Sequence, residues 1–293
     1  MIPMMNIIAW SHRAPWPELR QVEQDLILSR AIVAIFSEQH LRQQLRIRGG
    51  TALNKLHFPR PFRYSEDIDL VRTESSPIGP VLDHIRDVLE PWLGRANFDQ
   101  SPVAPKLRFK VAAEDAASPA LIRVKLEINT AETEAYDPPR GIPFRVDNPW
   151  FNGSAEVMTF TTEEMLATKL RALLQREKGR DLFDLAHGLD VFKDLNRARL
   201  LECFNLYLKR ANLKIPRAEA EKRMFAKLRR PRFLDDMKPL LPAAAFHQFG
   251  DESTQQAFLT VFNHLVVNLP GEPWAKTEEY LKERGMLENS IPS

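Results

Sequence analysis

The chain has 293 residues, of which 44% are hydrophobic, and its 41 basic and 39 acidic residues nearly balance. This length can bury the core of one large domain or two smaller ones. A single cysteine, Cys203, excludes an internal disulfide and fits a reducing compartment. The longest apolar run, residues 31–36, is far shorter than a membrane span, and the first ten residues lack the pattern of a signal peptide. We therefore expect a soluble, cytoplasmic protein without a membrane partner.

The first half of the sequence mixes helical and strand patterns. Apolar residues recur at helical spacing within residues 17–44, and a short strand, LRIR, then enters a turn at Gly49 and Gly50. Pro59 and Pro61 stop any helix that begins after this turn. The further elements predicted here are strands at 67–71, 106–111 and 121–129, a helix at 79–93 and a proline-rich connection at 137–149.

From about residue 157 the pattern becomes helical. Thr161 and Glu164 have the spacing of a capping box, and the apolar residues after them recur at helical spacing until Gly179. Further helices are predicted at 180–192, 197–210, 217–229 and 254–268. The sequence therefore predicts the α+β class, with a mixed sheet flanked by helices in residues 1–156 and a mainly helical domain in residues 157–293.

Two carboxylates, Asp67 and Asp69, lie on a strand that alternates polar and apolar residues. Residues two apart on a strand point to the same face, about 6.6 Å from one another. Carboxylates at this spacing can converge on Mg²⁺, which takes oxygen ligands and completes its shell with water and phosphate. The alternative is a solvated edge strand, since the Asp-x-Asp pattern is common.

Gly49 and Gly50 lie between a strand and a helix start at Thr51. Glycines allow backbone N–H groups to approach an anion closely, and a helix N-terminus favours negative charge, so this turn could hold a triphosphate. The alternative is an ordinary strand-to-helix turn. The chain contains neither the GxxxxGK[ST] pattern of a Walker-type loop nor the GxGxxG pattern of dinucleotide-binding proteins.

Glu127 is the candidate for a third metal ligand, because it lies on the polar face of the strand at residues 121–129. If this strand pairs with the Asp67 strand, three carboxylates converge and repel one another unless a cation is present. The alternative is a surface ion pair of Glu127 with Lys125 or Arg123.

A basic segment, residues 209–232, holds ten Lys or Arg against two Glu. Such an excess favours a phosphate-backbone partner with salt-sensitive affinity. The alternative is a basic face packed against the acidic residues 233–293 or against an acidic partner. The candidate nucleic-acid-binding residues are Lys222, Arg223, Lys227, Arg229 and Arg230.

The motifs GGTALNKLHFPRPFRYSEDIDLV and TTEEMLATKLRALLQREKGRDLFDL, in this order, resemble the AbiEii/AbiGii toxin family. The resemblance covers about residues 15–210. Members are nucleotidyltransferases of the DNA-polymerase-β-like superfamily, so the resemblance implies a nucleotidyltransferase-like N-terminal half whose active site the helical half completes. It implies phosphate binding by Gly49, Gly50 and Thr51 and metal binding by Asp67 and Asp69.

The resemblance also gives roles to residues outside the strand. Lys169 corresponds to the family's helical lysine and would contact phosphate, although the residue pattern alone favours a surface lysine with a packed stem. Asp181 is implied as a catalytic or site-organising acid, or it simply caps its helix. The further candidates for phosphate contact are Arg63, Ser65 and Arg180.

The expected function is Mg²⁺-dependent transfer of a nucleotide from an NTP to an acceptor hydroxyl. By resemblance the protein would be the toxin of a toxin–antitoxin pair, with RNA, in particular tRNA, as acceptor and a cognate antitoxin as partner. One alternative is a phosphotransferase that moves the γ-phosphate to a protein or small molecule. Another is a non-catalytic nucleotide- or RNA-binding module.

Overall fold

The computed structural model describes residues 2–114, 121–230, 233–246 and 249–287. The chain divides into two compact units, residues 1–161 and residues 162–293. Within the described residues, no helix has the length and apolar character that a membrane crossing requires.

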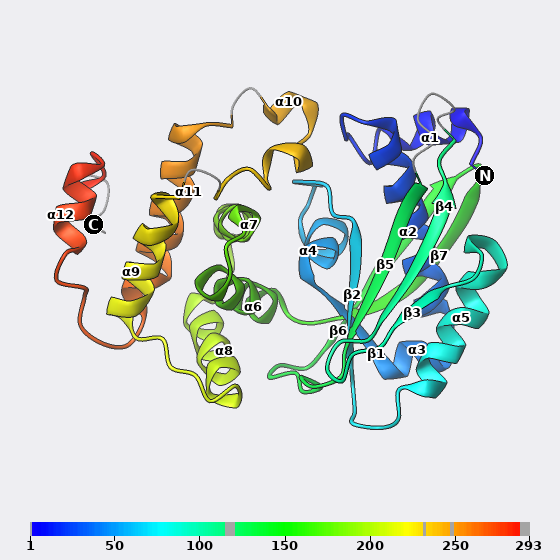
Figure 1. The fold of residues 1–293 in the computed structure, drawn as a ribbon, viewed down its shortest axis with the longest axis horizontal. Helices are drawn as coiled ribbons and strands as arrows, with labels where there is room; N and C mark the ends of the chain where they lie inside the picture. Colours follow the sequence, from blue (N-terminus) through cyan, green and yellow to red (C-terminus); the bar gives the residue numbers. More distant parts are fainter. Residues whose placement is uncertain (1, 115–120, 231–232, 247–248, 288–293) are drawn as a thin grey trace. The chain divides into compact units, whose positions relative to one another are not determined.

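The first unit is built on a seven-stranded mixed sheet with the order β3-β4-β5-β2-β1-β7-β6 (Figure 1). Strand β2 is central: it pairs antiparallel with β1 and parallel with β5, so its neighbours come from distant parts of the sequence. The strands are β1 (Leu45–Arg48), β2 (Asp67–Arg72), β3 (Asn97–Asp99), β4 (Lys106–Ala112), β5 (Leu121–Asn129), β6 (Arg140–Asn148) and β7 (Phe151–Thr159).

The helices of this unit support the sheet. Helix α2 packs against β5 and β7, and most of its apolar residues are buried. The helix predicted over residues 17–44 is in fact two helices, because Glu38 has extended backbone angles and its carboxylate caps the next helix by accepting from Leu41 N–H at 2.5 Å. The helical segments are α1 (Met4–Trp10), α2 (Leu19–Ser37), α3 (Gln39–Gln44), α4 (Gly49–Ala52), the π-helical η1 (Leu53–His57) and α5 (Gly79–Leu93).

The prediction of a connection at residues 137–149 is wrong. Residues 140–148 form strand β6, which pairs antiparallel with β7 along its whole length. Strand β6 is at the edge of the sheet. An edge strand has a neighbouring strand on one side only. A proline such as Pro143, which lacks an N–H, is therefore tolerated there.

The second unit is helical, as the sequence predicts, and helix α6 packs against α7 and α8. Cys203 is fully buried in α8, in agreement with a packing role. The predicted helix at 254–268 begins earlier and ends in a separate short turn. The elements are α6 (Thr162–Gln175), α7 (Gly179–Val191), α8 (Arg197–Arg210), α9 (Arg217–Leu228), η2 (Lys238–Leu240), α10 (Ala243–Phe246), α11 (Asp251–His264), η3 (Val266–Asn268) and α12 (Thr277–Glu283).

Candidate active site

The sheet brings the three predicted carboxylates onto neighbouring strands. Asp69 lies opposite Glu127 in the parallel pairing of β2 with β5, so these two strands are adjacent, as a three-carboxylate site requires. Ile68 and Leu70 point to the other face and are buried, which holds β2 in this orientation. The alternative of a solvated edge strand is therefore wrong for Asp67 and Asp69, because β2 is an inner strand.

The glycine turn lies directly against one of these carboxylates. Gly49 has φ of +81°, and a Cβ built at this position would lie 2.2 Å from Asp69 Oδ2. A Cβ on Gly50 would lie 2.5 Å from Arg63 Nη2. Both positions therefore exclude side chains, and at Gly49 the backbone conformation itself favours glycine. The turn and the carboxylates form one continuous patch.

Side chains from the turn hold the loop that leads into β2. The hydroxyl of Thr51, which is fully buried, donates to the carbonyl of Asp67 and lies 2.9 Å from Ser65 Oγ. Asn54 Nδ2 donates to the carbonyl of Gly50 at 2.9 Å. The side-chain Oδ1 of Asn54 accepts the backbone N–H of Arg63 at 2.9 Å. These bonds fix the position of Asp67 relative to the glycine turn.

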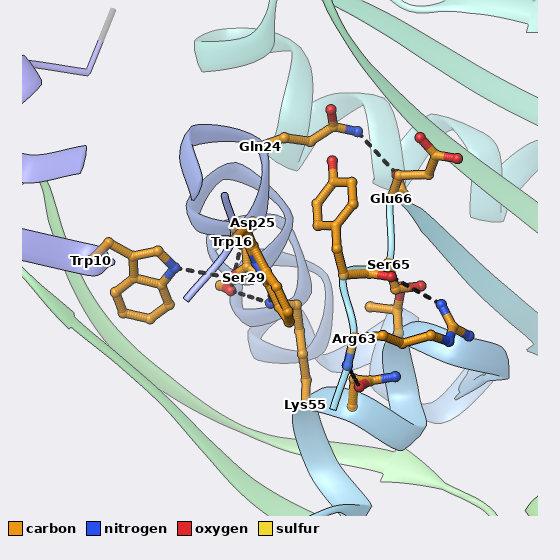
Figure 2. A network of polar contacts seen from close by, with 12 residues as sticks. Trp10, Trp16, Gln24, Asp25, Ser29, Lys55, Arg63, Ser65 and Glu66 are labelled. Carbon is orange, nitrogen blue, oxygen red and sulfur yellow. Dashed lines mark hydrogen bonds and ion pairs between the residues drawn. The ribbon is translucent and has the colours of Figure 1, made fainter. Parts of the chain in front are cut away.

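Arg63 and the segment after it are also fixed from the helical side. The Arg63 guanidinium is buried and donates to the carbonyl of Tyr64 at 2.9 Å. Gln24 of α2 donates to the carbonyl of Glu66 at 3.3 Å (Figure 2). It also donates to the carbonyl of Arg123 at 2.9 Å and so joins the start of β2 to β5. The backbone that carries the carboxylates is therefore well supported.

A lysine lies among the carboxylates. Lys125 Nζ is 2.9 Å from Asp67 Oδ2 and 3.5 Å from Glu127 Oε2, and Lys106 Nζ is 3.6 Å from the same Glu127 atom. Burial alone would lower the pKa of Lys125, but the hydrogen bond and charge of Asp67, with the charges of Glu127 and Asp69, raise it above its ordinary value. The pairing of Glu127 with Lys125, proposed above as the alternative, is present here.

This arrangement is not a closed metal cage. Within the described part of the chain, no group of three or more His, Cys, Asp or Glu side chains is arranged to hold a metal ion. The oxygen atoms that lie around Lys125 and Lys106 are nevertheless carboxylate oxygens, the ligands that a hard divalent cation prefers.

The second unit contains a separate cluster of opposite charges. Lys169 Nζ lies 3.1 Å from Asp181 Oδ1 and 2.9 Å from Asp184 Oδ2, and Arg176 Nε lies 2.7 Å from Asp181 Oδ2. Lys169 is 5% exposed, so the alternative of a surface lysine is wrong. Burial alone would raise the pKa of Asp181, but Lys169 and Arg176 lower it below its ordinary value, so this carboxylate is ionised at neutral pH.

Arg180 lies near the start of α7. Its Nε is 3.8 Å from Asp236 Oδ2, and the other oxygen of this carboxylate accepts the backbone N–H of Gly179 at 2.9 Å. Asp236, which the sequence analysis did not single out, therefore helps to hold the start of α7.

The five basic candidates for nucleic-acid contact lie on or after α9 and differ in exposure. Lys222, Arg229 and Arg230 are exposed, and Arg223 is half-buried beside Glu219 at 2.7 Å. Lys227 is 5% exposed, and its ammonium donates to the carbonyl of Arg176 at 2.6 Å. The Arg229 guanidinium lies 4.1 Å from the centre of the Tyr280 ring, and Arg230 pairs with Glu177.

Sequence reasoning missed Asn54 as a site-organising residue and treated Lys125 only as a partner for Glu127. A signal for Asn54 existed, because it follows the glycine turn by one helical turn and can reach back to its carbonyl. The contact of Lys125 with Asp67 depends on the pairing of β2 with β5, which local pattern does not reveal.

Comparisons with known proteins identify a family and a fold. Residues 30–258 match the family described as "Nucleotidyl transferase AbiEii toxin, Type IV TA system". No curated protein matches the sequence. The fold is similar to that of the nucleotidyltransferase toxin MenT4 from Mycobacterium tuberculosis, with a TM-score of 0.58 and 14% identity over 99% of this chain and 98% of that one.

Two structures from Helicobacter pylori are also similar. JHP933 has a TM-score of 0.54 and 17% identity over 92% of this chain and 97% of that one. A putative nucleotidyltransferase has a TM-score of 0.52 and 17% identity over 93% of this chain and 98% of that one. These likenesses bear on the fold, whereas the family match covers most of the sequence. The chain therefore belongs to the AbiEii family of nucleotidyltransferase toxins of type IV toxin–antitoxin systems.

Proposed function

We propose that this protein transfers the nucleotidyl group of an NTP to an acceptor hydroxyl with the help of Mg²⁺, and that the acceptor is RNA, in particular tRNA. The observation that supports this most directly is the contact between the glycine turn and the carboxylates. Gly49 leaves room for the Asp69 carboxylate, so a phosphate bound at the turn would lie beside the metal-binding oxygens.

The residues present fit a divalent cation at Asp67 and Asp69, with Glu127 as a third candidate. The support for a cation at these residues comes from Lys125. Its ammonium lies between Asp67 and Glu127, and these carboxylates raise its pKa. This patch therefore favours positive charge. When bound, Mg²⁺ would lower the pKa of the attacking hydroxyl and offset charge on the phosphates.

The remaining residues of the patch bind and orient the nucleotide. The glycine turn at Gly49 and Gly50 offers its backbone N–H groups to the phosphates. Thr51 and Ser65 keep the turn beside Asp67 through their hydroxyls. Arg63, whose guanidinium lies over Gly50, adds positive charge on the side of the turn where the phosphates bind.

In the second unit we propose catalytic roles for Lys169 and Asp181 and phosphate contact for Arg180. The acceptor RNA is proposed to contact the basic surface of α9, with Lys222, Arg229 and Arg230 as its exposed residues and Arg223 and Lys227 as its less accessible ones. A cognate antitoxin is the expected protein partner, as in a type IV toxin–antitoxin system.

The test is transfer from NTPs labelled at the α- or γ-phosphate to total cellular RNA, with each of the four bases. We expect the α label to enter RNA. Asp67→Asn should reduce this transfer at least about a hundredfold, because several kcal/mol of transition-state stabilisation are lost. Asp147→Asn, an exposed carboxylate on β6, is the matched control and should retain the activity.

Two results would contradict the proposal. Transfer of the γ label alone would identify a phosphotransferase, and full activity of Asp67→Asn would remove the strand carboxylates from the chemistry. A growth assay of the same variants should follow the transfer activity.

A further inference from the structure

The sheet of the first unit carries a second feature of functional character, a row of cations on strands β4 and β5. These strands pair antiparallel and lie side by side (Figure 1). Every polar position of β4 is basic, namely Lys106, Arg108 and Lys110, and β5 adds Arg123 and Lys125. We call these five residues the basic strip. Residues two apart on a strand share a face, so the cations recur about every 6.6 Å along each strand.

The basic strip lies on the solvent-facing side of these two strands. The apolar residues between the cations, such as Phe109 and Val124, are fully buried on the opposite side, where helices α2 and α5 pack. Arg108, Lys110 and Arg123 are exposed. A large ligand in solution can therefore reach this part of the sheet.

The strand register places like charges opposite one another. Lys110 lies directly opposite Arg123, and we call these two residues the like-charge pair. Within the described part of the chain, neither of the two side chains has an acidic partner. Like charges directly opposite one another destabilise a sheet. Departures of this kind from the rules of strand pairing are expected at functional sites.

The other cations of the strip lead to the candidate active site and are already paired. Lys125 lies opposite Asp67 in the pairing of β2 with β5, and its ammonium is 2.9 Å from this carboxylate. Lys106 and Arg108 also have carboxylate partners. The free charge of the strip is therefore the like-charge pair, which begins two residues along β5 from a residue that contacts a candidate metal ligand.

We propose that the basic strip binds the phosphate backbone of a nucleic-acid strand, and that the like-charge pair makes the phosphate contacts. Uncompensated lysine and arginine side chains on one exposed face favour phosphate groups. The strip ends at the carboxylates Asp67 and Glu127, which would repel an acidic protein. A nucleic-acid strand can place its phosphates on the cations and bring only a hydroxyl to the carboxylates.

This surface is additional to the basic residues of α9. Its contacts are to phosphate, so binding should depend little on base sequence. If the proposed function holds, the bound strand is the acceptor; this last step alone rests on that function.

The experiment measures binding of the full chain to a labelled single-stranded RNA, and to DNA of the same sequence, by fluorescence anisotropy in EDTA without NTP. The double substitution Lys110→Gln and Arg123→Gln should weaken binding at least about tenfold for every sequence. It should also reduce the slope of log affinity against log salt by about 1.4, since each lost phosphate contact on a single strand contributes about 0.7. Tighter binding of RNA than of DNA would add contacts to the ribose, and equal binding would mean that phosphate alone is read; both agree with the proposal.

The matched control is the double substitution Arg86→Gln and Lys193→Gln, which changes the net charge by the same amount. Arg86 lies on α5 and Lys193 follows α7, and each is in a surface ion pair. Its affinity should stay within about twofold of wild type. The like-charge variant should unfold at the same temperature as wild type or a higher one, because the substitutions remove a repulsion.

Unchanged affinity or an unchanged salt slope in the like-charge variant would overturn the proposal. An equal loss in the control would assign binding to net charge, and a lower unfolding temperature of the like-charge variant would make the pair structural; either result would overturn it. Equal binding of polyglutamate would identify an acidic protein as the ligand and would overturn it too. Because binding is measured without NTP, a failure of nucleotide transfer contradicts the proposed function and leaves this inference standing.

Discussion

The protein has two clusters in which a lysine lies between carboxylates, and their surroundings differ sharply. In the strand cluster (Asp67, Asp69, Lys125 and Glu127), the side chains of Asp67 and Glu127 are each 33% exposed. In the helix cluster (Lys169, Arg176, Asp181 and Asp184), both aspartates are 0% exposed. The distances between lysine and carboxylate are similar, so solvent access and charge balance make the difference.

The charge balance indicates what each cluster can do. In the helix cluster, Lys169 and Arg176 neutralise the two aspartates, and the buried charges therefore depend on one another. In the strand cluster, the charges of Asp67, Glu127 and Asp69 all raise the pKa of Lys125, and solvent reaches the side chains of Asp67 and Glu127, so positive charge is favoured there. The strand cluster is suited to exchange a cation or ligand, whereas the helix cluster holds the proposed catalytic residues Lys169 and Asp181 in fixed positions.

The largest expected effect comes from removal of the lysine in each cluster. Lys169→Met removes the ammonium that lies between two fully buried aspartates, and this should lower the free energy of unfolding by about 3–5 kcal/mol. Lys125→Met removes an ion pair that solvent screens, and the loss should stay within about 1 kcal/mol. Urea denaturation of both variants measures the difference.

The two methionine variants are matched controls for one another, because the change in the side chain is identical. Equal losses of unfolding free energy would contradict the comparison. A loss of more than about 3 kcal/mol in Lys125→Met would show that the strand cluster, too, is part of the buried framework.

The sequence predicted the elements that carry both clusters, because these depend on local pattern. The alternation of β2, the glycine turn and the apolar spacing of α6 are visible within a few residues. Gly49 is predictable for the same reason: a glycine between strand and helix indicates an unusual backbone angle or a close neighbour, and here both are present.

What the sequence did not reveal depends on long-range pairing. Lys125 reaches Asp67 only because β2 pairs in parallel with β5, and the period of a strand indicates its faces but not its neighbours. Strand β6 escaped prediction because Pro143 and the prolines on either side of the strand indicate a loop, and only its position at the sheet edge makes Pro143 acceptable. The burial of Lys169 likewise follows from how α6 packs against α7.

The next effect concerns the contact between the glycine turn and the strand cluster. Gly49→Ala places a Cβ against Asp69 in a backbone conformation that side chains rarely adopt, and should lower the free energy of unfolding by about 1–3 kcal/mol. Gly79→Ala is the control, because a Cβ there meets nothing within 4 Å. Thermal or urea unfolding gives the stabilities, and α-label transfer gives the activity. If Gly49→Ala retains wild-type stability and wild-type transfer activity, the close approach of Asp69 to Gly49 is not required for either.

The smallest expected effect is the pH dependence of the free energy of unfolding, which has opposite signs in the two clusters. Asp181 has a pKa below its ordinary value of 3.8, so its stabilisation is present above about pH 3.8 and is lost as the pH falls through the folded-state pKa. Lys125 has a pKa above its ordinary value of 10.5, so its stabilisation is present below about pH 10.5 and is lost as the pH rises through the folded-state pKa.

The difference in unfolding free energy between wild type and Lys169→Met should therefore narrow in acid below pH 3.8. The difference in unfolding free energy between wild type and Lys125→Met should narrow in alkali above pH 10.5 and should also shrink in 1 M salt, since the side chains of its partners Asp67 and Glu127 are partly exposed. Denaturation at several pH values and two salt concentrations measures the pH effect and the salt effect for each of the two variants. Equal sensitivity to salt in both variants would mean that the two clusters do not differ in their access to solvent, and the assignment of the strand cluster as the exchangeable one would then have no physical basis.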